Sequence, residues 1–295
     1  MSGERLGTLE FMHWCQTQPD ALALSHRGMA MNYRALGQRV FAKMERLARA
    51  GFGPGRRLAI VPGVNFDDTV RLLAAIEMCV PLVLIHPALP AAEQARRAQG
   101  AGARFVEEGA RLDEASPGSG TFAVLFTSGT TGEAKKVRIS RDAVAAALDG
   151  SAARLGWRDE DRWGLFLPPA HIGGLSVLLR CLRAGRTVVL SVCAMERVTM
   201  LSLVPTQLHR LLEANVRLPP SVRVVLVGGA PLTSELRERA ERSGYPVYPT
   251  YGMTETCAQA ATARPGEPGT GQLLEGLEGK IHDGVLWLRG PSLFD

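Results

Sequence analysis

Apolar side chains in the first third of the chain recur at spacings that alternate between helical and strand-like. After Asn32 they recur every three or four residues until Gly51, which predicts an amphipathic helix that Asn32 caps and Gly51 ends. Short apolar runs at 58–61 and 82–85 lie on either side of a second helical stretch at 66–78. A strand, a helix and a strand in this order predict a βαβ unit.

The same alternation continues to residue 242. Apolar runs predict strands near 122–126, 165, 188–190, 201–204 and 224–227, and helical spacing predicts helices at about 140–155, 175–182, 207–213 and 234–242. Because these strands are continuous apolar runs, both faces of their sheets should be covered. The predicted fold class is α/β, with two doubly wound, mostly parallel sheets flanked by helices.

Glycine and proline interrupt any helical pattern after Thr262. Asp283-Gly284 separates two apolar segments in the way that a two-residue hairpin turn does. We therefore expect a small C-terminal antiparallel β unit at about 263–295, which follows subdomains at about 1–125 and 126–262.

Composition narrows the class of protein. The 295 residues are 46% hydrophobic and 21% charged, which is close to the globular average and excludes disordered and fibrous classes. The net charge of +5 comes mostly from scattered arginines, because the chain has only four lysines, Lys43, Lys135, Lys136 and Lys280. No basic stripe interleaves with aromatic residues, so we expect no nucleic-acid partner.

Cysteine usage and the N-terminal residues favour a cytoplasmic location. The five cysteines (Cys15, Cys79, Cys181, Cys193, Cys257) are odd in number and far apart, with no C-x-x-C pair, which fits a reducing compartment. Residues 1–10 carry charges where a signal peptide needs an apolar run. No segment reaches the roughly 18 apolar residues of a membrane span, so we expect no membrane partner.

The strand at 122–126 leads into a loop suited to phosphate oxygens. Hydroxyl side chains, two glycines and a final lysine follow one another in Thr127, Ser128, Gly129, Thr130, Thr131, Gly132 and, three residues later, Lys135. The Walker pattern does not fit, because no lysine directly follows Gly132. A solvated hairpin is the plainer interpretation, but two of the four lysines fall in this loop.

Residues 251–256 form a second polar segment, directly after a strand predicted to end at Val247-Tyr248. The carboxylate of Glu255 beside the hydroxyl of Thr254 could hold Mg²⁺ and hydrogen-bond a phosphate at the carboxyl edge of a sheet. A helix N-cap is the structural alternative for an isolated Thr-Glu pair.

Two further segments have both a functional and a structural interpretation. His171 lies beside Gly173 and Gly174, where a hydrogen-bonded turn histidine is the plainer alternative to a ligand contact. Gly228, Gly229 and Ala230 end another strand with little side chain, so a planar ligand could lie against them. An ordinary strand-to-helix turn would explain them equally well.

Taken together, these segments resemble the adenylate-forming enzymes, the superfamily of acyl- and aryl-CoA ligases, peptide-synthetase adenylation domains and luciferases. The matching motifs occur in the order of that family: T-S-G-T-T-G-x-x-K at 127–135, P-x-x-H-x-x-G-L at 168–175, V-P-T at 204–206, G-G-A-P at 228–231 and Y-G-M-T-E-T at 251–256. The resemblance covers nearly the whole chain, from Asn32 to Pro291.

The resemblance implies a role for each segment. The residues from Thr127 to Gly132, with Lys135, would embrace the phosphates of ATP. Adenine would be bordered by Gly229, Ala230 and Tyr251, the α-phosphate contacted by Thr254, and Mg²⁺ held by Glu255. The acyl pocket would be lined by His171, Gly228 and Gly252. The catalytic groups would be Lys135, Thr254 and Glu255.

The resemblance implies the ATP-dependent activation of an aryl carboxylic acid, with 2-succinylbenzoate as the first choice, to an acyl-adenylate, followed by transfer to CoA. A benzoate- or anthranilate-like acid, a non-catalytic adenylate-binding module and a relative with another function remain alternatives. Two features depart from the family. Ala134 stands where the family usually has proline, and the 295 residues contain no counterpart of the smaller C-terminal domain, which carries an Asp and a Lys. We therefore expect an N-terminal adenylation domain that works with a C-terminal domain supplied separately.

Overall fold

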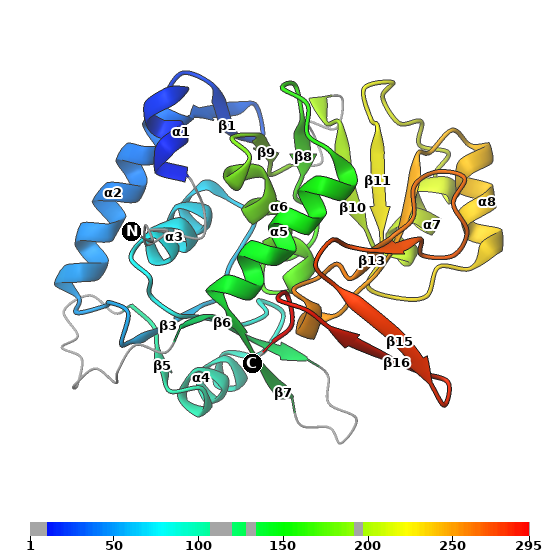
Figure 1. The fold of residues 1–295 in the computed structure, drawn as a ribbon. Coiled ribbons are helices and arrows are strands. Elements are labelled where there is room, and N and C mark those ends of the chain that lie inside the picture. The colour runs from blue at the N-terminus through cyan, green and yellow to red at the C-terminus, as the bar shows by residue number, and fades with distance from the viewer. Residues whose placement is uncertain (1–10, 107–119, 128–133, 192–196, 295) are drawn as a thin grey trace, which may run out of the picture.

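The computed structural model describes residues 11–106, 120–127, 134–191 and 197–294. In these parts of the chain the strands form a nine-stranded sheet, a five-stranded sheet and a two-stranded hairpin, and helices cover the two larger sheets (Figure 1). The predicted α/β class with two mostly parallel sheets is confirmed.

The nine-stranded sheet is parallel from β12 to β1, with antiparallel strands at both ends. Its order is β14 (Gln272–Leu273), β13 (Ala261–Thr262), β12 (Val247–Tyr251), β11 (Val224–Val227), β10 (Met200–Leu203), β8 (Arg162–Gly164), β9 (Thr187–Val189), β1 (Leu22–His26), β2 (Met29–Asn32). The β1–β2 hairpin from the start of the chain thus completes a sheet whose other strands come from its second half.

The five-stranded sheet is parallel except for its last pair. Its order is β5 (Ala103–Arg104), β3 (Arg57–Ile60), β4 (Leu82–Leu84), β6 (Thr121–Thr127), β7 (Lys135–Ser140). The antiparallel pairing of β6 with β7 sets Thr127 opposite Lys135 at the end of the hairpin.

Helices lie between the two sheets and outside each of them. The shared inner layer consists of α1 (Phe11–Thr17), α2 (Tyr33–Arg49), α3 (Phe66–Glu77), α5 (Arg141–Leu155) and α6 (Ile172–Arg183). The five-stranded sheet packs on α4 (Ala91–Gly100) on its other face, and the nine-stranded sheet packs on α7 (Pro205–Glu213) and α8 (Ser234–Arg242).

Alternate residues of the central strands enter different cores. In β11, Val224 and Leu226 join the inner core, whereas Val225 and Val227 join the outer core with α7 and α8. This period of two explains why the strands are apolar without interruption.

Sequence patterns located most elements correctly. Asn32 caps α2 and Ser140 caps α5, each through a side chain that accepts a backbone N–H. The hairpin predicted at Asp283-Gly284 is confirmed as β15 (Glu278–His282) and β16 (Val285–Arg289). The patterns missed α1 and α4, the β1–β2 hairpin, β5, β7 and the 3₁₀ turn at Thr254–Thr256.

Two features of the structure bear on the expectations about a membrane and about the cysteines. None of the helices in the described ranges is long and apolar enough to span a membrane. Cys15, Cys79, Cys181 and Cys257 form no disulfide within the described ranges, and Cys193 lies outside them. The division of the chain into subdomains stays a prediction.

Glu77, the last residue of α3, makes stability depend on pH. Burial raises its pKa to about 7, against the opposing effect of the Arg141 guanidinium. Between the unfolded pKa near 4.5 and this value, the folded state keeps a proton that the unfolded state has lost. The contribution of Glu77 is therefore present at low pH and lost as pH rises towards 7, by roughly 3 kcal/mol at most.

We predict that in Glu77→Gln the free energy of unfolding falls less as the pH rises towards 7, because the amide cannot lose a proton. Urea unfolding followed by circular dichroism from pH 5 to pH 8 measures the free energy of unfolding. Glu45→Gln is the control, since Glu45 is an exposed residue on α2. Parallel profiles for the wild type and Glu77→Gln would contradict the raised pKa.

Candidate active site

The carboxyl ends of strands from both sheets meet at one seam. Two contacts cross it: Lys135 Nζ lies 3.6 Å from Glu255 Oε1, and the imidazoles of His86 and His171 have centroids 4.9 Å apart. Lys135 begins β7 and His86 follows β4, both in the five-stranded sheet, whereas Glu255 and His171 belong to segments that follow strands of the nine-stranded sheet. Ligands of α/β proteins bind at such carboxyl edges.

The structure places the two ends of the predicted phosphate loop but not its middle. Thr127 ends β6 and Lys135 begins β7, directly opposite it. Ser128, Gly129, Thr130, Thr131 and Gly132 lie outside the described residues. The loop interpretation therefore rests on its two ends.

The two lysines of β7 point to different partners, as consecutive strand residues do. Lys135 faces Glu255 and also lies over the Phe294 ring, 5.5 Å from its centroid. Lys136 donates to the Gly100 carbonyl oxygen at 2.5 Å, away from the seam. Only Lys135 is thus available to a ligand at the seam.

The Lys135–Glu255 pair is weak enough to be replaced. The Lys135 side chain is 58% exposed and that of Glu255 is 21% exposed. Ion pairs with such exposure contribute about 0–1 kcal/mol. A phosphate could therefore replace Glu255 beside Lys135, which would release the carboxylate to a cation.

Thr254 and Glu255 lie in a single 3₁₀ turn, η2 (Thr254–Thr256). Thr256 caps this turn, because its Oγ1 accepts the Met253 N–H at 3.0 Å. The helix-cap alternative for Thr254 is therefore wrong. Glu255 receives support from the other side, since the Phe294 N–H donates to its carbonyl oxygen at 2.9 Å.

Strand register brings the predicted adenine-binding residues together. β11 pairs with β12 so that Val227 lies opposite Pro249, and the same offset sets Gly229 level with Tyr251. Gly229 and Ala230 are exposed, and Gly229 has a φ of +79°, which favours glycine. These residues form an open backbone surface at the carboxyl edge.

Gly228 and Gly252 are required by close packing. A Cβ on Gly252 would lie 1.5 Å from the Ala258 carbonyl oxygen, and a Cβ on Gly228 would lie 2.5 Å from Thr250 Cγ2. Both glycines therefore let the ends of β11 and β12 lie close to neighbouring backbone and side chains. The structure does not show either of them in an acyl pocket.

A buried chain of hydrogen bonds supports the end of β12. Ser151 Oγ donates to Gln259 Oε1 at 2.7 Å, Gln259 Nε2 donates to Thr262 Oγ1 at 2.7 Å, and Thr262 Oγ1 contacts Thr250 Oγ1 at 3.1 Å. Satisfied buried polar chains rigidify the segments that they join. No sequence motif marked these residues.

His171 does not act as a hydrogen-bonded turn histidine. Its backbone N–H donates to the Pro168 carbonyl oxygen and its own carbonyl accepts the Leu175 N–H, so the main chain closes the turn. Its exposed ring instead faces His86. The pKa of His171 lies below its usual value because neighbouring atoms displace water and because His86 is close.

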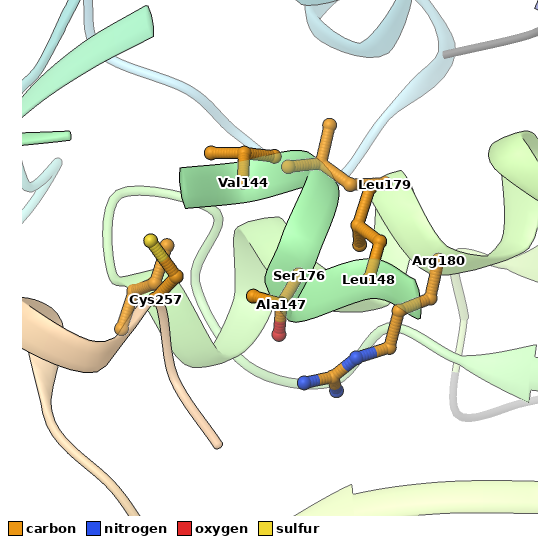
Figure 2. A pocket seen from close by; sticks show the side chains of 8 residues that line it. Val144, Ala147, Leu148, Ser176, Leu179, Arg180 and Cys257 are labelled. Atoms are coloured by element: carbon orange, nitrogen blue, oxygen red, sulfur yellow. The ribbon is translucent and has the colours of Figure 1, made fainter. Parts of the chain in front are cut away.

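A small pocket lies between α5, α6 and the segment that follows η2 (Figure 2). The space within it, which is partly open to solvent, is about 240 Å³. Its lining is mostly apolar: Val144, Ala147, Leu148, Ile172, Ser176, Leu179, Arg180, Cys257. Ile172 directly follows His171, so the pocket adjoins the seam.

Arg180 is an unusual residue for such a lining. The side chain is buried, its Nε has no hydrogen-bond partner, and within the described residues no carboxylate forms an ion pair with it. The guanidinium lies over the Trp163 ring, 5.4 Å from its centroid. Burial lowers its pKa to about 10, so it stays charged at neutral pH. Sequence reasoning missed it, because a single arginine in an apolar helix carries no motif.

The described residues offer one carboxylate for a magnesium ion at the seam. They contain no cluster of three or more His, Cys, Asp or Glu side chains that could hold a metal alone. Mg²⁺ usually takes one or two protein carboxylates and completes its shell with water and substrate phosphates. Glu255 fits that pattern, because its carboxylate faces the ends of the predicted phosphate loop.

Comparison with known proteins agrees with the fold and the motifs. Residues 107–295 match the family described as AMP-binding enzyme, which is well over half of the chain. The chain therefore belongs to the AMP-binding enzyme family. The predicted resemblance to adenylate-forming enzymes is confirmed.

Within this family the chain is similar to 2-succinylbenzoate–CoA ligases. It is 30% identical to the ligase of Bacillus pumilus over 93% of this chain, but spans only 65% of that relative's length. The Bacillus subtilis o-succinylbenzoate CoA synthetase in complex with the acyl-adenylate intermediate OSB-AMP has a TM-score of 0.86 and 27% identity, over 96% of this chain and 88% of that one. The same enzyme with ATP and magnesium ion has a TM-score of 0.85 and 28% identity, over 96% of this chain and 71% of that one.

We predict that Gly252→Ala displaces the segment from Tyr251 to Glu255, because its Cβ would collide with the Ala258 carbonyl. Overpacking of this kind costs roughly 1–3 kcal/mol in the free energy of unfolding. Urea unfolding measures the loss, and Gly53→Ala is the control, since a Cβ on Gly53 meets nothing within 4 Å. Equal stability of the two variants would contradict the close packing.

Proposed function

We propose that this protein activates an aryl carboxylic acid with ATP and passes the acyl group to CoA. The observation that supports it most is the meeting of Lys135 and Glu255, 3.6 Å apart, from segments of two different sheets. A cation for phosphate oxygens and a carboxylate for Mg²⁺ are the two charges that nucleotide binding requires, and they face one another at the seam.

The first step is attack of a carboxylate oxygen of the acid on the α-phosphorus of ATP. A new P–O bond forms, the bond to the β-phosphate oxygen breaks, and pyrophosphate leaves. The thiol of CoA then attacks the acyl carbon, AMP leaves, and the thiol proton passes to solvent. The carboxylate is its own nucleophile, so the protein needs to supply alignment and charge neutralisation rather than a base.

Each predicted residue has a place in this scheme. Lys135 and the loop 127–132 would bind the phosphates, and Thr254 would hydrogen-bond the α-phosphate. Glu255 would hold Mg²⁺, which neutralises phosphate charge when it is bound. Adenine would lie on Gly229 and Ala230 beside Tyr251. His171, with Gly228 and Gly252, would border the acyl group.

We propose 2-succinylbenzoate, an acid of menaquinone biosynthesis, as the substrate. It has two carboxylates, one of which reacts while the other needs a partner. Arg180 supplies a buried positive charge without a carboxylate partner among the described residues, in a pocket that adjoins His171. An isolated buried charge costs several kcal/mol, which an anionic substrate group would offset. The sequence His171-Ile-Gly-Gly-Leu-Ser and the similarity to the Bacillus ligases support the same acid.

The pocket is too narrow for an aromatic ring in this structure, since its side chains leave room for little more than one water molecule. Binding of the acid would therefore require the side chains of α5 and α6 to move apart. Benzoate- or anthranilate-like acids with a single carboxylate are the alternative, and they would leave Arg180 unpaired.

We further propose that the 295 residues act as an N-terminal adenylation domain together with a smaller C-terminal domain. The curated relative is longer than this chain, which supports a further part in the complete machinery. We also propose a cytoplasmic location, because ATP and CoA are both found there.

Lys135→Ala should weaken ATP binding in the presence of Mg²⁺. Loss of a charge-assisted hydrogen bond costs roughly 1.5–3 kcal/mol, or about ten- to two-hundred-fold in affinity. Lys136→Ala is the matched control, because Lys136 donates to Gly100 away from the seam. Isothermal titration calorimetry measures both, and equal losses would show that the loop has another register.

Nucleotide binding without ATP–pyrophosphate exchange, in the presence of a C-terminal domain, would favour a non-catalytic module.

Arg180→Met should weaken binding of a stable sulfamoyl analogue of 2-succinylbenzoyl-adenylate by about ten- to hundredfold, while AMP binding stays unchanged. The protein itself should be as stable as the wild type or more stable, because an unpaired buried charge has been removed. Arg183→Met is the control, since Arg183 lies on the same helix and pairs with Asp149 on the surface. The benzoyl analogue, which has no second carboxylate, should bind both proteins equally. An equal loss for the two analogues would contradict the assignment of Arg180.

A further inference from the structure

His86 belongs to none of the sequence motifs, yet its ring lies against that of the motif residue His171 across the seam. It follows β4 (Leu82–Leu84), and its ring lies 4.9 Å from the His171 ring with an interplanar angle of 41°. His171 precedes α6 as its N-cap residue. The pair therefore connects the five-stranded sheet to the helix that also carries Arg180.

A backbone hydrogen bond fixes which nitrogen of His86 carries the proton. The Ala88 N–H donates to His86 Nδ1 at 3.1 Å, so Nδ1 must be unprotonated to accept it. In the neutral ring the proton is then on Nε2. Within the described ranges His86 thus keeps an unused donor, Nε2–H, on the side of the ring that does not serve the turn.

Strand register places this donor beside the phosphate loop. β4 pairs in parallel with β6, with Leu82 opposite Ala123 and Val83 opposite Val124. The same offset carried forward sets His86 level with Thr127, the first residue of the loop. The two imidazoles therefore lie where the loop and the acyl side of the site meet.

The ring of His86 is more than the turn requires. An asparagine would accept the Ala88 N–H equally well, since its side-chain oxygen can reproduce the position of Nδ1. Burial and the nearby His86 both lower the pKa of His171, so the neutral ring of His171 is favoured.

We propose that His86 is a positioning residue for His171, and that the two imidazoles form one unit that hydrogen-bonds the reacting carboxylate of the acid beside the phosphate loop. The acid-binding part rests on the proposed function. The pairing itself rests on the geometry of the two rings and on the fixed tautomer of His86.

Two variants of His86 distinguish its role in the turn, where Nδ1 accepts the Ala88 N–H, from its role as a donor through Nε2. His86→Asn keeps the acceptor at the position of Nδ1 but removes the ring that faces His171. His86→Gln places an amide N–H near the position of Nε2. His209→Asn is the control, since His209 is exposed on α7, outside the seam.

The first measurement uses the ligand-free protein. ¹⁵N NMR should show Nδ1 of His86 unprotonated in the wild type, and the ring signals of His171 should shift in His86→Asn but not in His209→Asn. Thermal unfolding should stay unchanged in His86→Asn, because the turn is kept. Unshifted His171 signals in His86→Asn would overturn the pairing.

The second measurement is calorimetric binding of the sulfamoyl analogue of 2-succinylbenzoyl-adenylate, with AMP as the reference ligand. His86→Asn should bind the analogue about two- to tenfold more weakly, with AMP unaffected, and His86→Gln should recover most of the loss. Wild-type affinity in His86→Asn would overturn the positioning role. No binding by the wild type would overturn the proposed function and the acid-binding part with it, whereas the NMR signals would still decide the pairing.

Discussion

Both faces of both large sheets are apolar, so helices must cover all of them, and the arrangement of the other elements follows from this. Ile60 and Leu84 enter the inner core while Ala59 and Val83 pack towards α4, so neither face of the five-stranded sheet can be left in water. The same holds for β11, with α7 and α8 on its outer face. Because one layer of helices covers an inner face of each sheet, burial of a single core holds the two sheets together. The seam at their carboxyl ends follows from that burial.

Polar groups at the seam differ from polar groups that serve the fold. Asp161 is fully buried and accepts hydrogen bonds from Arg223, from Thr199 and from the Arg158 N–H. Burial would raise the pKa of Asp161, but Arg223 and the other two donors hold it below its usual value. Arg180 has no comparable carboxylate within the described ranges, and Lys135 and Glu255 form only an exposed pair. The buried charge of Arg180 thus lowers stability and the Lys135–Glu255 pair adds little to it, which is the pattern of sites built for a ligand.

Sequence reasoning succeeded where the signal is local. Apolar patterns located α2, α3 and most of the parallel strands, because burial on one face of a helix leaves helical spacing and burial on both faces of a strand leaves a continuous apolar run. β7 alternates charged and apolar residues as a half-buried strand does, but only Val137 and Ile139 carry the apolar half of the pattern. η2 is too short to leave a pattern. Lys135 and Glu255 do face one another, and Gly229 lies level with Tyr251 on neighbouring strands, while their roles stay predictions. The middle of the phosphate loop stays a prediction, because residues 128–133 lie outside the described ranges.

Arg180 was missed in the sequence because its relation to His171 depends on the geometry of α6 and on no motif. His171 caps α6, Ser176 lies more than one turn further along the helix, and Arg180 comes one turn after Ser176. At 1.5 Å per residue the nine residues from His171 to Arg180 span about 13 Å, and a helical side chain leans back towards the N-terminus, so the guanidinium reaches the pocket that Ile172 and Ser176 line. In the proposed function, α6 thus sets the distance between the reacting end of the acid and its second anionic group. In the same proposal the nucleotide is held by the loops of the seam, so changes along α6 would alter the choice of acid without altering the binding of ATP.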